Sequence, residues 1–530
     1  MAAQPARLIT GFLTVGTWTL LSRVFGFARD IMIAAFLGTG VVAEAFLVAF
    51  ALPNMFRRFF AEGAFNMAFV PMFSKRLEAD ENPQGFAQDA FSGMILVLAA
   101  FTILGIVFMP ALVFAMASGF TDDARFDLAV IYGRIAFPYI LLISLAALLS
   151  GVLNATGRFV AAAAAPVLLN VVFVAAILIG WAMGRPISDV PGLGLDELAG
   201  LRVGDTLAMS VPVAGALQMA FVWWAAKRAG YRLTITRPRL TPEMKRLAII
   251  AAPAALSGGV IQINLLVGRQ VASFFDGAIA WLTYADRLYQ LPLGVVGIAI
   301  GVVLLPDLSR RLRADDTAGG QDALSRAAEF ALTLTVPCTV AFLVIPLPLV
   351  ATLFQRGAFG VDDSAATALA LAIYGLGLPA FVIQKVWQPL YFAREDTTRP
   401  FYFALVALVV NAAAAVGLAP FVGFVSAALG TTLAGWIMAA LLIVYARPMG
   451  EAARLDARFR RRVPRIVLAS VGMGAVLFAA NVALGPLFGM GAWRYLALAI
   501  LVAVGMISYA LLAHLTGALN MGELRRALRR

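Results

Sequence analysis

LLSRVFGFARDIMIAAFLG, residues 20–38, is apolar over the length of a membrane span, but it contains Arg23, Arg29 and Asp30. A helix that crosses the hydrocarbon of a bilayer needs about 20 predominantly apolar residues. Each charged side chain at its centre costs about 3 kcal/mol on insertion scales. The three charges in this segment therefore predict that other helices, water or a ligand keep them away from lipid.

The composition predicts an all-α polytopic membrane protein. Of 530 residues, 62% are hydrophobic and only 13% are charged, whereas soluble domains are about 25% charged. The mean hydropathy is +0.89. The apolar runs have the length of membrane helices rather than of the shorter barrel strands. Prolines within these runs predict broken helices of the kind that transporters use, at Pro53, Pro138, Pro166, Pro212, Pro253, Pro292, Pro379 and Pro389.

Apolar windows predict fourteen transmembrane helices. They cover residues 8–37, 41–73, 90–117, 127–153, 159–183, 205–226, 247–275, 278–305, 327–354, 364–392, 400–419, 424–445, 466–485 and 494–515.

A repeat divides these helices into two lobes of the same orientation. PMFSKRLEAD (71–80) matches PDLSRRLRAD (306–315), and Pro138, Arg158 and Asn170 match Pro379, Arg399 and Asn411 at one common offset. The repeat predicts an N-lobe over residues 1–228 and a C-lobe over 229–446. Residues 447–530 add two further helices and a basic tail. Paired lobes around a central cavity suit alternating access.

The distribution of basic residues predicts the orientation. Most of the 41 Lys and Arg residues fall in the loops of one side, while the opposite loops hold Arg125, Arg185, Arg202, Arg356 and Arg494. The positive-inside rule then places both termini in the cytoplasm. The net charge of +12 is explained by loops that meet anionic headgroups, so we expect no nucleic-acid partner.

The sequence lacks the residues that several kinds of catalytic, metal and nucleotide site require. There is one Cys, Cys338, one His, His514, and no Lys in a Walker A context. Disulfides within the chain, thiolate metal clusters, Ser-His-Asp catalysis and ATP hydrolysis are therefore not expected. We expect no enzyme activity, no cofactor and no metal site.

The predicted spans hold more basic than acidic side chains. The basic residues are Arg23, Arg29, Arg57, Arg58, Arg134, Arg269, Arg287 and Lys385, and the acidic residues are Asp30, Glu44, Glu62 and Asp286.

Mutual pairing explains part of this set. Arg23 and Asp30 share a helix face, Arg58 and Glu62 stand at i, i+4, and a helix N-terminus favours Glu44. The adjacent Asp286 and Arg287 point about 100° apart on a helix, so pairing between them is not automatic. The arginines left over predict a hydrated cationic cavity for a phosphate-bearing ligand, since the planar guanidinium binds phosphate oxygens in pairs.

Four segments resemble the MurJ (MviN) family of lipid II flippases: SRVFGFARD (22–30), FALPNMFRRFFAEGAFNMAFVP (50–71), FPYILLISLAALLSGVLNATGRF (137–159) and YADRLYQLPLGVVGIAIGVVLLP (284–306). The resemblance implies the multidrug/oligosaccharidyl-lipid/polysaccharide (MOP) exporter fold with fourteen helices. In that fold the last two helices help to form a groove for a polyprenyl tail.

The resemblance also implies the site. The essential cavity arginines of the family fall on Arg23, Arg29, Arg57 and Arg287. Supporting or gating positions fall on Asp30, Asn54 and Glu62, while Glu44 replaces an expected Asp and has a longer reach. We add Arg58 and Asp286 as supporting residues from the charge pattern. Arg269 and Lys385 match no motif position, and no motif places a coupling ion.

The resemblance implies that the substrate is lipid II, the lipid-linked peptidoglycan precursor, moved from the inner to the outer leaflet of the bacterial inner membrane. Its pyrophosphate requires cationic groups. Its tail stays in lipid, because removing it from hydrocarbon costs about 0.8 kcal/mol per CH₂. Membrane lipids and cell-wall synthesis proteins are further expected partners. The alternatives are a flippase for another polyprenyl-pyrophosphate-linked oligosaccharide and a non-transporting scaffold of the cell-wall machinery. The excess of basic residues argues against a cationic-drug exporter, which would need an acidic cavity. The loops are too small for the sugar-nucleotide site of a membrane-embedded glycosyltransferase.

Overall fold

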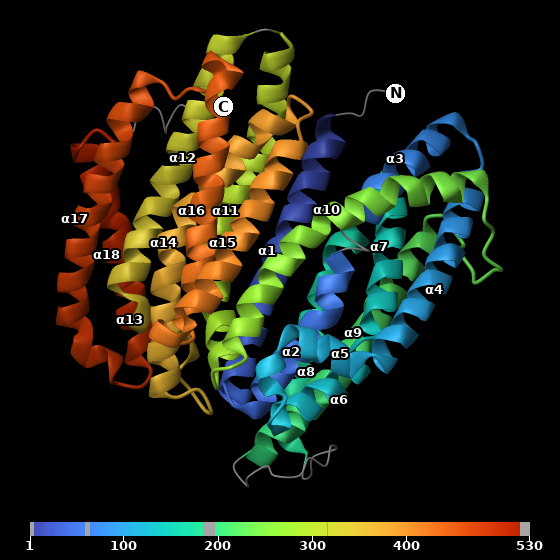
Figure 1. Cartoon of the computed structure of the whole chain (residues 1–530), viewed down its shortest axis with the longest axis horizontal. Helices are drawn as coiled ribbons and strands as arrows, with labels where there is room; N and C mark the ends of the chain where they lie inside the picture. Colours follow the sequence, from blue (N-terminus) through green and yellow to red (C-terminus); the bar gives the residue numbers. More distant parts are fainter. Residues whose placement is uncertain (1–4, 59–63, 184–196, 315, 520–530) are drawn as a thin grey trace. The chain divides into compact units, whose positions relative to one another are not determined.

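The computed structural model of the chain describes residues 5–58, 64–183, 197–314 and 316–519. Every regular element in these ranges is a helix (Figure 1). Ten of the described helices are long and apolar enough to span a membrane. The predicted class, an all-α polytopic membrane protein, is confirmed, and the count of fourteen spans stays a prediction.

The chain divides into two compact units, Met1–Ala280 with Arg356–Phe359, and Trp281–Gln355 with Gly360–Arg530. Because these units are defined by how the helices pack, α10 (Pro242–Ala272) belongs to the first unit. The division at residues 228 and 446 follows the sequence repeat and stays a prediction.

The first unit contains a tightly packed set of helices around α9. The helices are α1 (Pro5–Leu37), α2 (Val41–Arg57), α3 (Ala64–Ala79), α4 (Pro83–Val107), α5 (Met109–Met116), α6 (Ala124–Ala136), α7 (Tyr139–Ala155), α8 (Val160–Ala182), α9 (Glu197–Arg228) and α10 (Pro242–Ala272). α9 packs along α7 and α8, α1 packs along α8, and α2 packs against α6. A Cβ on Gly180 would lie 2.8 Å from the Val203 Cα, so glycine permits the close approach of α8 and α9.

The second unit is built around α14. Its helices are α11 (Ala278–Arg313), whose first residues belong to the first unit, α12 (Thr317–Val344), α13 (Pro346–Phe354), α14 (Val361–Phe392), α15 (Thr398–Val422), α16 (Val425–Ala446), α17 (Ala457–Phe488) and α18 (Trp493–Leu515). α14 packs against α12 and α16, and α17 packs against α12 and α18. Trp387 and Leu390 lie buried in this core.

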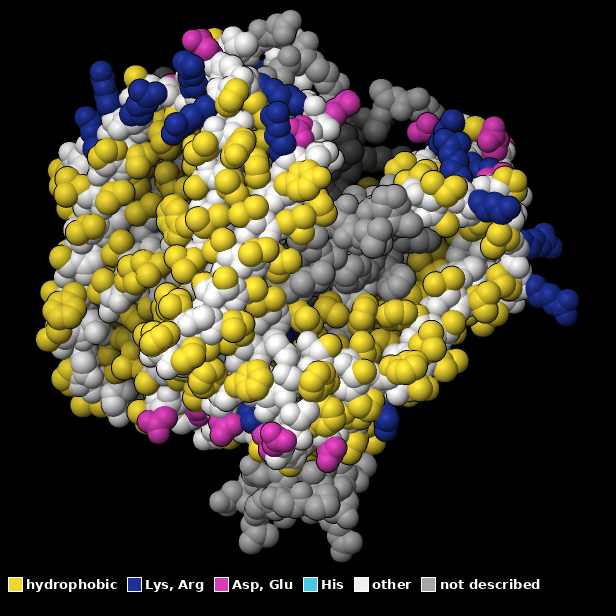
Figure 2. Space-filling model, viewed as in Figure 1, with side chains coloured by type: hydrophobic (Ala, Val, Ile, Leu, Met, Phe, Trp, Pro, Cys, Tyr) yellow, Lys and Arg dark blue, Asp and Glu magenta, His cyan; other side chains and the backbone are white. Residues whose placement is uncertain are grey.

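The ends of the helices in the second unit differ in charge. Figure 2 shows Lys and Arg side chains gathered mostly at one end and Asp and Glu at the other, with apolar side chains on the flanks between them. Exposed Arg399 and Arg447 follow α14 and α16 at the basic end, and exposed Asp362 begins α14 at the other. This is the charge pattern of helices that run from one membrane surface to the other.

The prediction that prolines break the helices is wrong at most positions. Only Pro138, between α6 and α7, separates two helices as predicted, and unpredicted breaks occur where α5 and α13 begin near Pro110 and Pro346. Six helices continue through these prolines: α2 through Pro53, α8 through Pro166, α9 through Pro212, α10 through Pro253, α11 through Pro292, and α14 through Pro379 and Pro389. Local adjustment of the helix and packed neighbours can satisfy the backbone groups that a proline frees.

Two glycines bring the segment Arg356–Phe359 against the end of α1. The Ala358 N–H donates to the Ala35 carbonyl oxygen at 2.8 Å. Gly38 and Gly357 flank this bond, both with positive φ, and a Cβ on Gly357 would lie 2.1 Å from the Ala35 oxygen. Only glycine combines this backbone conformation with this approach.

We expect Gly357→Ala to lower the thermal stability of the detergent-solubilised protein more than Gly491→Ala does. Both positions have a positive φ, +57° and +48°, but a Cβ on Gly491 meets no atom within 4 Å. Gly491→Ala should therefore cost only the conformational penalty of about 1–2 kcal/mol, whereas Gly357→Ala also breaks the contact with α1. Equal losses would show that the close approach contributes nothing.

Candidate functional site

Arg29 is the centre of a buried polar cluster on α1 and α8. Its Nη2 lies 2.6 Å from the Asp30 Oδ1, and its Nη1 donates to the Asn170 Oδ1 at 3.0 Å. The Asn170 amide in turn donates to the Ser22 carbonyl oxygen at 3.0 Å, and the Phe173 ring lies 5.6 Å from the guanidinium carbon. Arg29 and Asp30 are each only 7% exposed, so the charge that the sequence places in α1 is neutralised and hydrogen-bonded.

This arrangement corrects the expected pairing on α1. Asp30 pairs with its sequence neighbour Arg29, although Arg23 shares its helix face. The long arginine side chain compensates for the roughly 100° between adjacent positions of a helix. Arg23 is exposed in this structure, almost two helical turns nearer the start of α1 than Asp30.

A second buried cluster forms around Glu44, in the first turn of α2. The Glu44 Oε2 lies 2.8 Å from the Arg125 Nη1, and its Oε1 accepts a hydrogen bond from the Ile279 backbone N–H at 3.0 Å. Arg125 also contacts Asp123, 2.8 Å from its Nε, and Asp276, 2.9 Å from its Nη2. Glu44 is 1% exposed. One carboxylate therefore joins α2, α6 and the first turn of α11.

Arg125 is the site residue that the sequence analysis missed. The loop charges use it only to indicate orientation, and the sequence predicts only the helix N-terminus as a favourable environment for Glu44. The structure instead places its guanidinium beside a buried carboxylate. A local signal exists, because Asp123 caps α6 by accepting from the Arg125 N–H at 2.7 Å. That cap fixes where the arginine side chain starts, but its long-range partner is not visible in the sequence.

The end of α2 carries the next expected residues. The Asn54 side-chain amide donates to the Phe50 carbonyl oxygen at 2.9 Å, within its own helix. Arg57 is half-buried and Arg58 is exposed. Glu62 lies outside the described residues, so its expected pairing with Arg58 stays a prediction.

The remaining expected residues lie in the second unit, on α11. Asp286 and Arg287 are both half-buried, and the Gln290 side-chain amide donates to the Asp286 carboxylate one turn on. Of the two basic residues without a motif, Arg269 is half-buried on α10 and Lys385 is exposed on α14. The four expected arginines therefore divide between the units, three on α1 and α2 and one on α11.

Glu44→Ala should destabilise the protein far more than Asp276→Ala. Glu44→Ala removes the most buried of the three carboxylates that contact Arg125, and it also removes the acceptor of the Ile279 N–H. Removing one partner of a buried ion pair typically costs about 3–5 kcal/mol. The Asp276 side chain contacts the same guanidinium, but it is 96% exposed, and exposed pairs contribute little. Chemical unfolding of both variants in the same detergent measures the difference. Similar losses would contradict a structural role for the Glu44–Arg125 pair.

Comparisons with known proteins identify the family of this chain. The family profile described as lipid II flippase MurJ matches residues 33–512. A probable lipid II flippase MurJ of Rhizobium meliloti is 43% identical, with 99% of this chain and 96% of the relative covered. The lipid II flippase MurJ of Burkholderia cenocepacia is 34% identical over 84% of each chain.

Solved structures show the same fold. A lipid II flippase MurJ in an inward closed conformation matches with a TM-score of 0.77 and 22% identity, over 98% of this chain and 100% of the other. An inward-facing MATE family transporter of the MOP superfamily matches with a TM-score of 0.65 and 15% identity, over 83% and 98%. The MOP exporter fold is thereby confirmed, and the chain belongs to the MurJ family of lipid II flippases.

Proposed function

We propose that this protein moves lipid II from the inner to the outer leaflet by alternating access through a cationic cavity. The observation that carries the proposal is the 43% identity, over nearly the full length, with a probable lipid II flippase. The arginines on α1, α2 and α11 supply the chemistry. A guanidinium group binds pyrophosphate oxygens in a bidentate manner and keeps its charge when it is partly dehydrated.

The arginines divide into two roles in this proposal. Arg29 already has a carboxylate and an amide oxygen as partners, so it gives the ligand a fixed, partly neutralised donor. Arg23 is exposed, and Arg57 and Arg287 are half-buried on other helices. These three supply the positive charge that attracts the pyrophosphate. Asp30 and Asn54 support the site, and Asp286 does so next to Arg287.

The buried Glu44 cluster supports a gating role. Its members come from three helices, α2, α6 and α11. A carboxylate that loses buried partners is costly unless water or a new partner replaces them. The bonds therefore favour one arrangement of these helix ends. Opening at this end of the first unit would require the cluster to break or exchange partners, which makes Glu44 a switch point.

A cavity in the second unit suits the polyprenyl tail. It measures about 600 Å³ and lies between α13 and α17, where Leu347, Pro348 and Phe488 line it with Asn481 and Arg494. Tail carbons that remain in such a groove or in lipid avoid a transfer cost of about 0.8 kcal/mol per CH₂. Only the headgroup then has to cross the membrane core.

The orientation completes the proposal. Both termini lie in the cytoplasm, because the basic loops favour that side, and the headgroup moves outward from there. The rival cargo is another polyprenyl-pyrophosphate-linked oligosaccharide, which would use the same arginines. A scaffold without transport activity would not need arginines on α1, α2 and α11 at all. Loss of transport in arginine variants would exclude the scaffold, because a scaffold has no transport to lose.

Arg23→Ala, Arg29→Ala, Arg57→Ala and Arg287→Ala should each insert normally and fail to support growth when the native copy is depleted. Lys385→Ala is the matched control, since it also removes a basic side chain from a membrane helix but matches no motif position. Lipid II exposure on the outer leaflet is measured in the same strains, at equal expression. Normal lipid II exposure in at least three of the four arginine variants would refute the cationic site.

Arg57→Ala should impair lipid II exposure more than Arg58→Ala. Arg57 is half-buried at the end of α2, whereas Arg58 is exposed, and the loss of an exposed side chain removes fewer contacts. The two variants change the same residue type one position apart, so each is the control of the other. The reverse order would mean that Arg58 faces the substrate.

A further inference from the structure

An extended segment connects α9 to α10 and is held firmly against the first unit. We call residues 231–241 the strap. The Thr234 N–H donates to the Gln88 Oε1 at 2.9 Å, and the Gln88 amide donates back to the Thr234 carbonyl oxygen. The Trp223 indole donates to the Leu233 carbonyl oxygen at 3.0 Å, and the Leu233 side chain is 1% exposed. The strap therefore has a fixed backbone although it has no regular secondary structure.

The strap exposes both apolar and basic side chains. Ile235 and Leu240 are 79% and 80% exposed, and Arg237 and Arg239 lie between them in sequence and are also exposed. Exposed aliphatic side chains next to arginines are typical of segments that lie in the membrane interface. Trp224, at the end of α9, is half-exposed under the Arg228 guanidinium, and tryptophan is enriched at the same depth.

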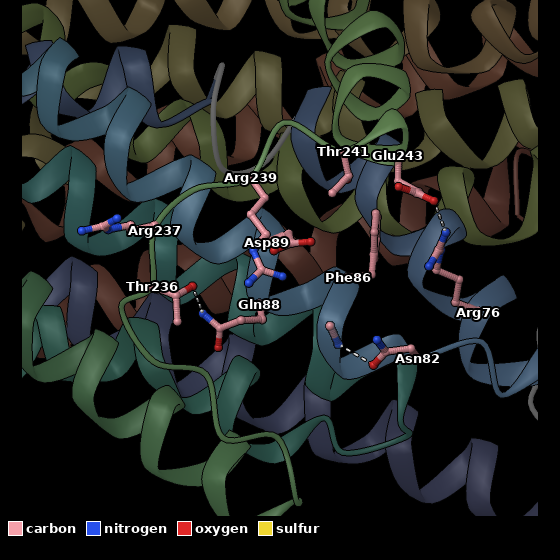
Figure 3. Close-up of a pocket in the computed structure, with 11 residues that line it drawn as sticks. Arg76, Asn82, Phe86, Gln88, Asp89, Thr236, Arg237, Arg239, Thr241 and Glu243 are labelled. Carbon is pink, nitrogen blue, oxygen red and sulfur yellow. Dashed lines mark hydrogen bonds and ion pairs between the residues drawn. The ribbon is translucent and has the colours of Figure 1, made fainter.

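A cavity of about 670 Å³ lies beneath the strap, between it and the first turns of α4 and α10. In Figure 3 the Arg239 side chain points toward Asp89 and Gln88, whereas Arg237 points away from the other lining residues. Arg76 borders the opposite side of the cavity. The cavity therefore has one arginine inside and one at its outer edge on the strap.

The charges of the cavity do not cancel. Arg76 lies 3.0 Å from the Glu243 carboxylate, so this pair is neutral. Hydrogen bonds from the Glu243 backbone N–H and the Thr241 hydroxyl, together with Arg76, lower the pKa of Glu243 and keep it ionised. Neither Arg237 nor Arg239 forms an ion pair within the described part of the chain. Two arginines against Asp89 leave one positive charge for an anionic ligand.

We propose that the strap and the cavity beneath it bind the phosphodiester headgroup of an anionic phospholipid from the membrane that the protein spans. Arg239 contacts the phosphate inside the cavity, and Arg237 adds charge at its edge. Ile235 and Leu240 enter the acyl region beside the bound lipid. A free phosphate ion would use the arginines but not the two exposed aliphatic side chains, which is why the lipid is the preferred occupant.

The test uses the full-length protein in detergent, titrated with dioctanoyl phosphatidylglycerol while thermal unfolding is followed. The wild type should show a saturable increase in Tm. A basic residue near an anionic surface contributes about five-fold in affinity. Arg239→Gln should therefore weaken the apparent affinity about five-fold, and the double variant Arg237→Gln/Arg239→Gln about 25-fold. Without lipid, the variants should melt like the wild type, because both side chains are exposed.

Arg232→Gln is the matched control, because Arg232 is exposed on the same strap but does not line the cavity. It should keep the wild-type affinity. An equal loss in this control would reduce the effect to general surface charge and overturn the site. Inorganic phosphate and dioctanoyl phosphatidylcholine at the same concentrations should give no shift. A full shift with either would overturn the assignment to an anionic lipid.

Discussion

An ionised side chain in a low-dielectric interior must find an opposite charge and hydrogen bonds, and this constraint organises the first unit. Taking a carboxylate or a guanidinium out of water costs several kcal/mol even after relaxation. An ion pair with Asp30 and a hydrogen bond to Asn170 offset this cost for Arg29. An ion pair with Arg125 and a hydrogen bond from a backbone N–H offset it for Glu44. Apolar packing alone would allow the helices to slide or rotate, whereas these bonds have fixed lengths and directions.

The partners of each buried charge come from different helices, so the charges also position the backbone. The Asn170 side-chain oxygen on α8 accepts from Arg29 of α1, and the Asn170 amide donates to the Ser22 carbonyl oxygen of the α1 backbone. Glu44 connects α2 with α6 and with the first turn of α11. A transporter that changes shape must exchange such bonds rather than stretch them, because buried polar groups without partners are costly.

Equivalent positions of the sequence repeat serve different contacts. Asn170 and Asn411 are both buried, and the repeat relates them. Asn170 faces α1, where a Cβ on Gly26 would lie 3.6 Å from its amide. Asn411, on α15, instead lies against α16, where a Cβ on Gly430 would lie 2.7 Å from its side-chain oxygen. The two asparagines that the predicted repeat relates are therefore both buried, and the glycines beside them lie on α1 and α16.

The sequence by itself determined the helical class, the membrane location and the family, because long apolar runs and short charged motifs such as SRVFGFARD are local properties of the chain. It also identified Arg29, Asp30 and Glu44 as charges that need partners. Only the tertiary structure decided which partners they have. Arg125 lies 81 residues from Glu44 and Asn170 lies 141 residues from Arg29, and no periodicity connects such positions. The effect of each proline was also decided by the tertiary structure, because a helix continues through a proline where its neighbours can satisfy the freed backbone groups.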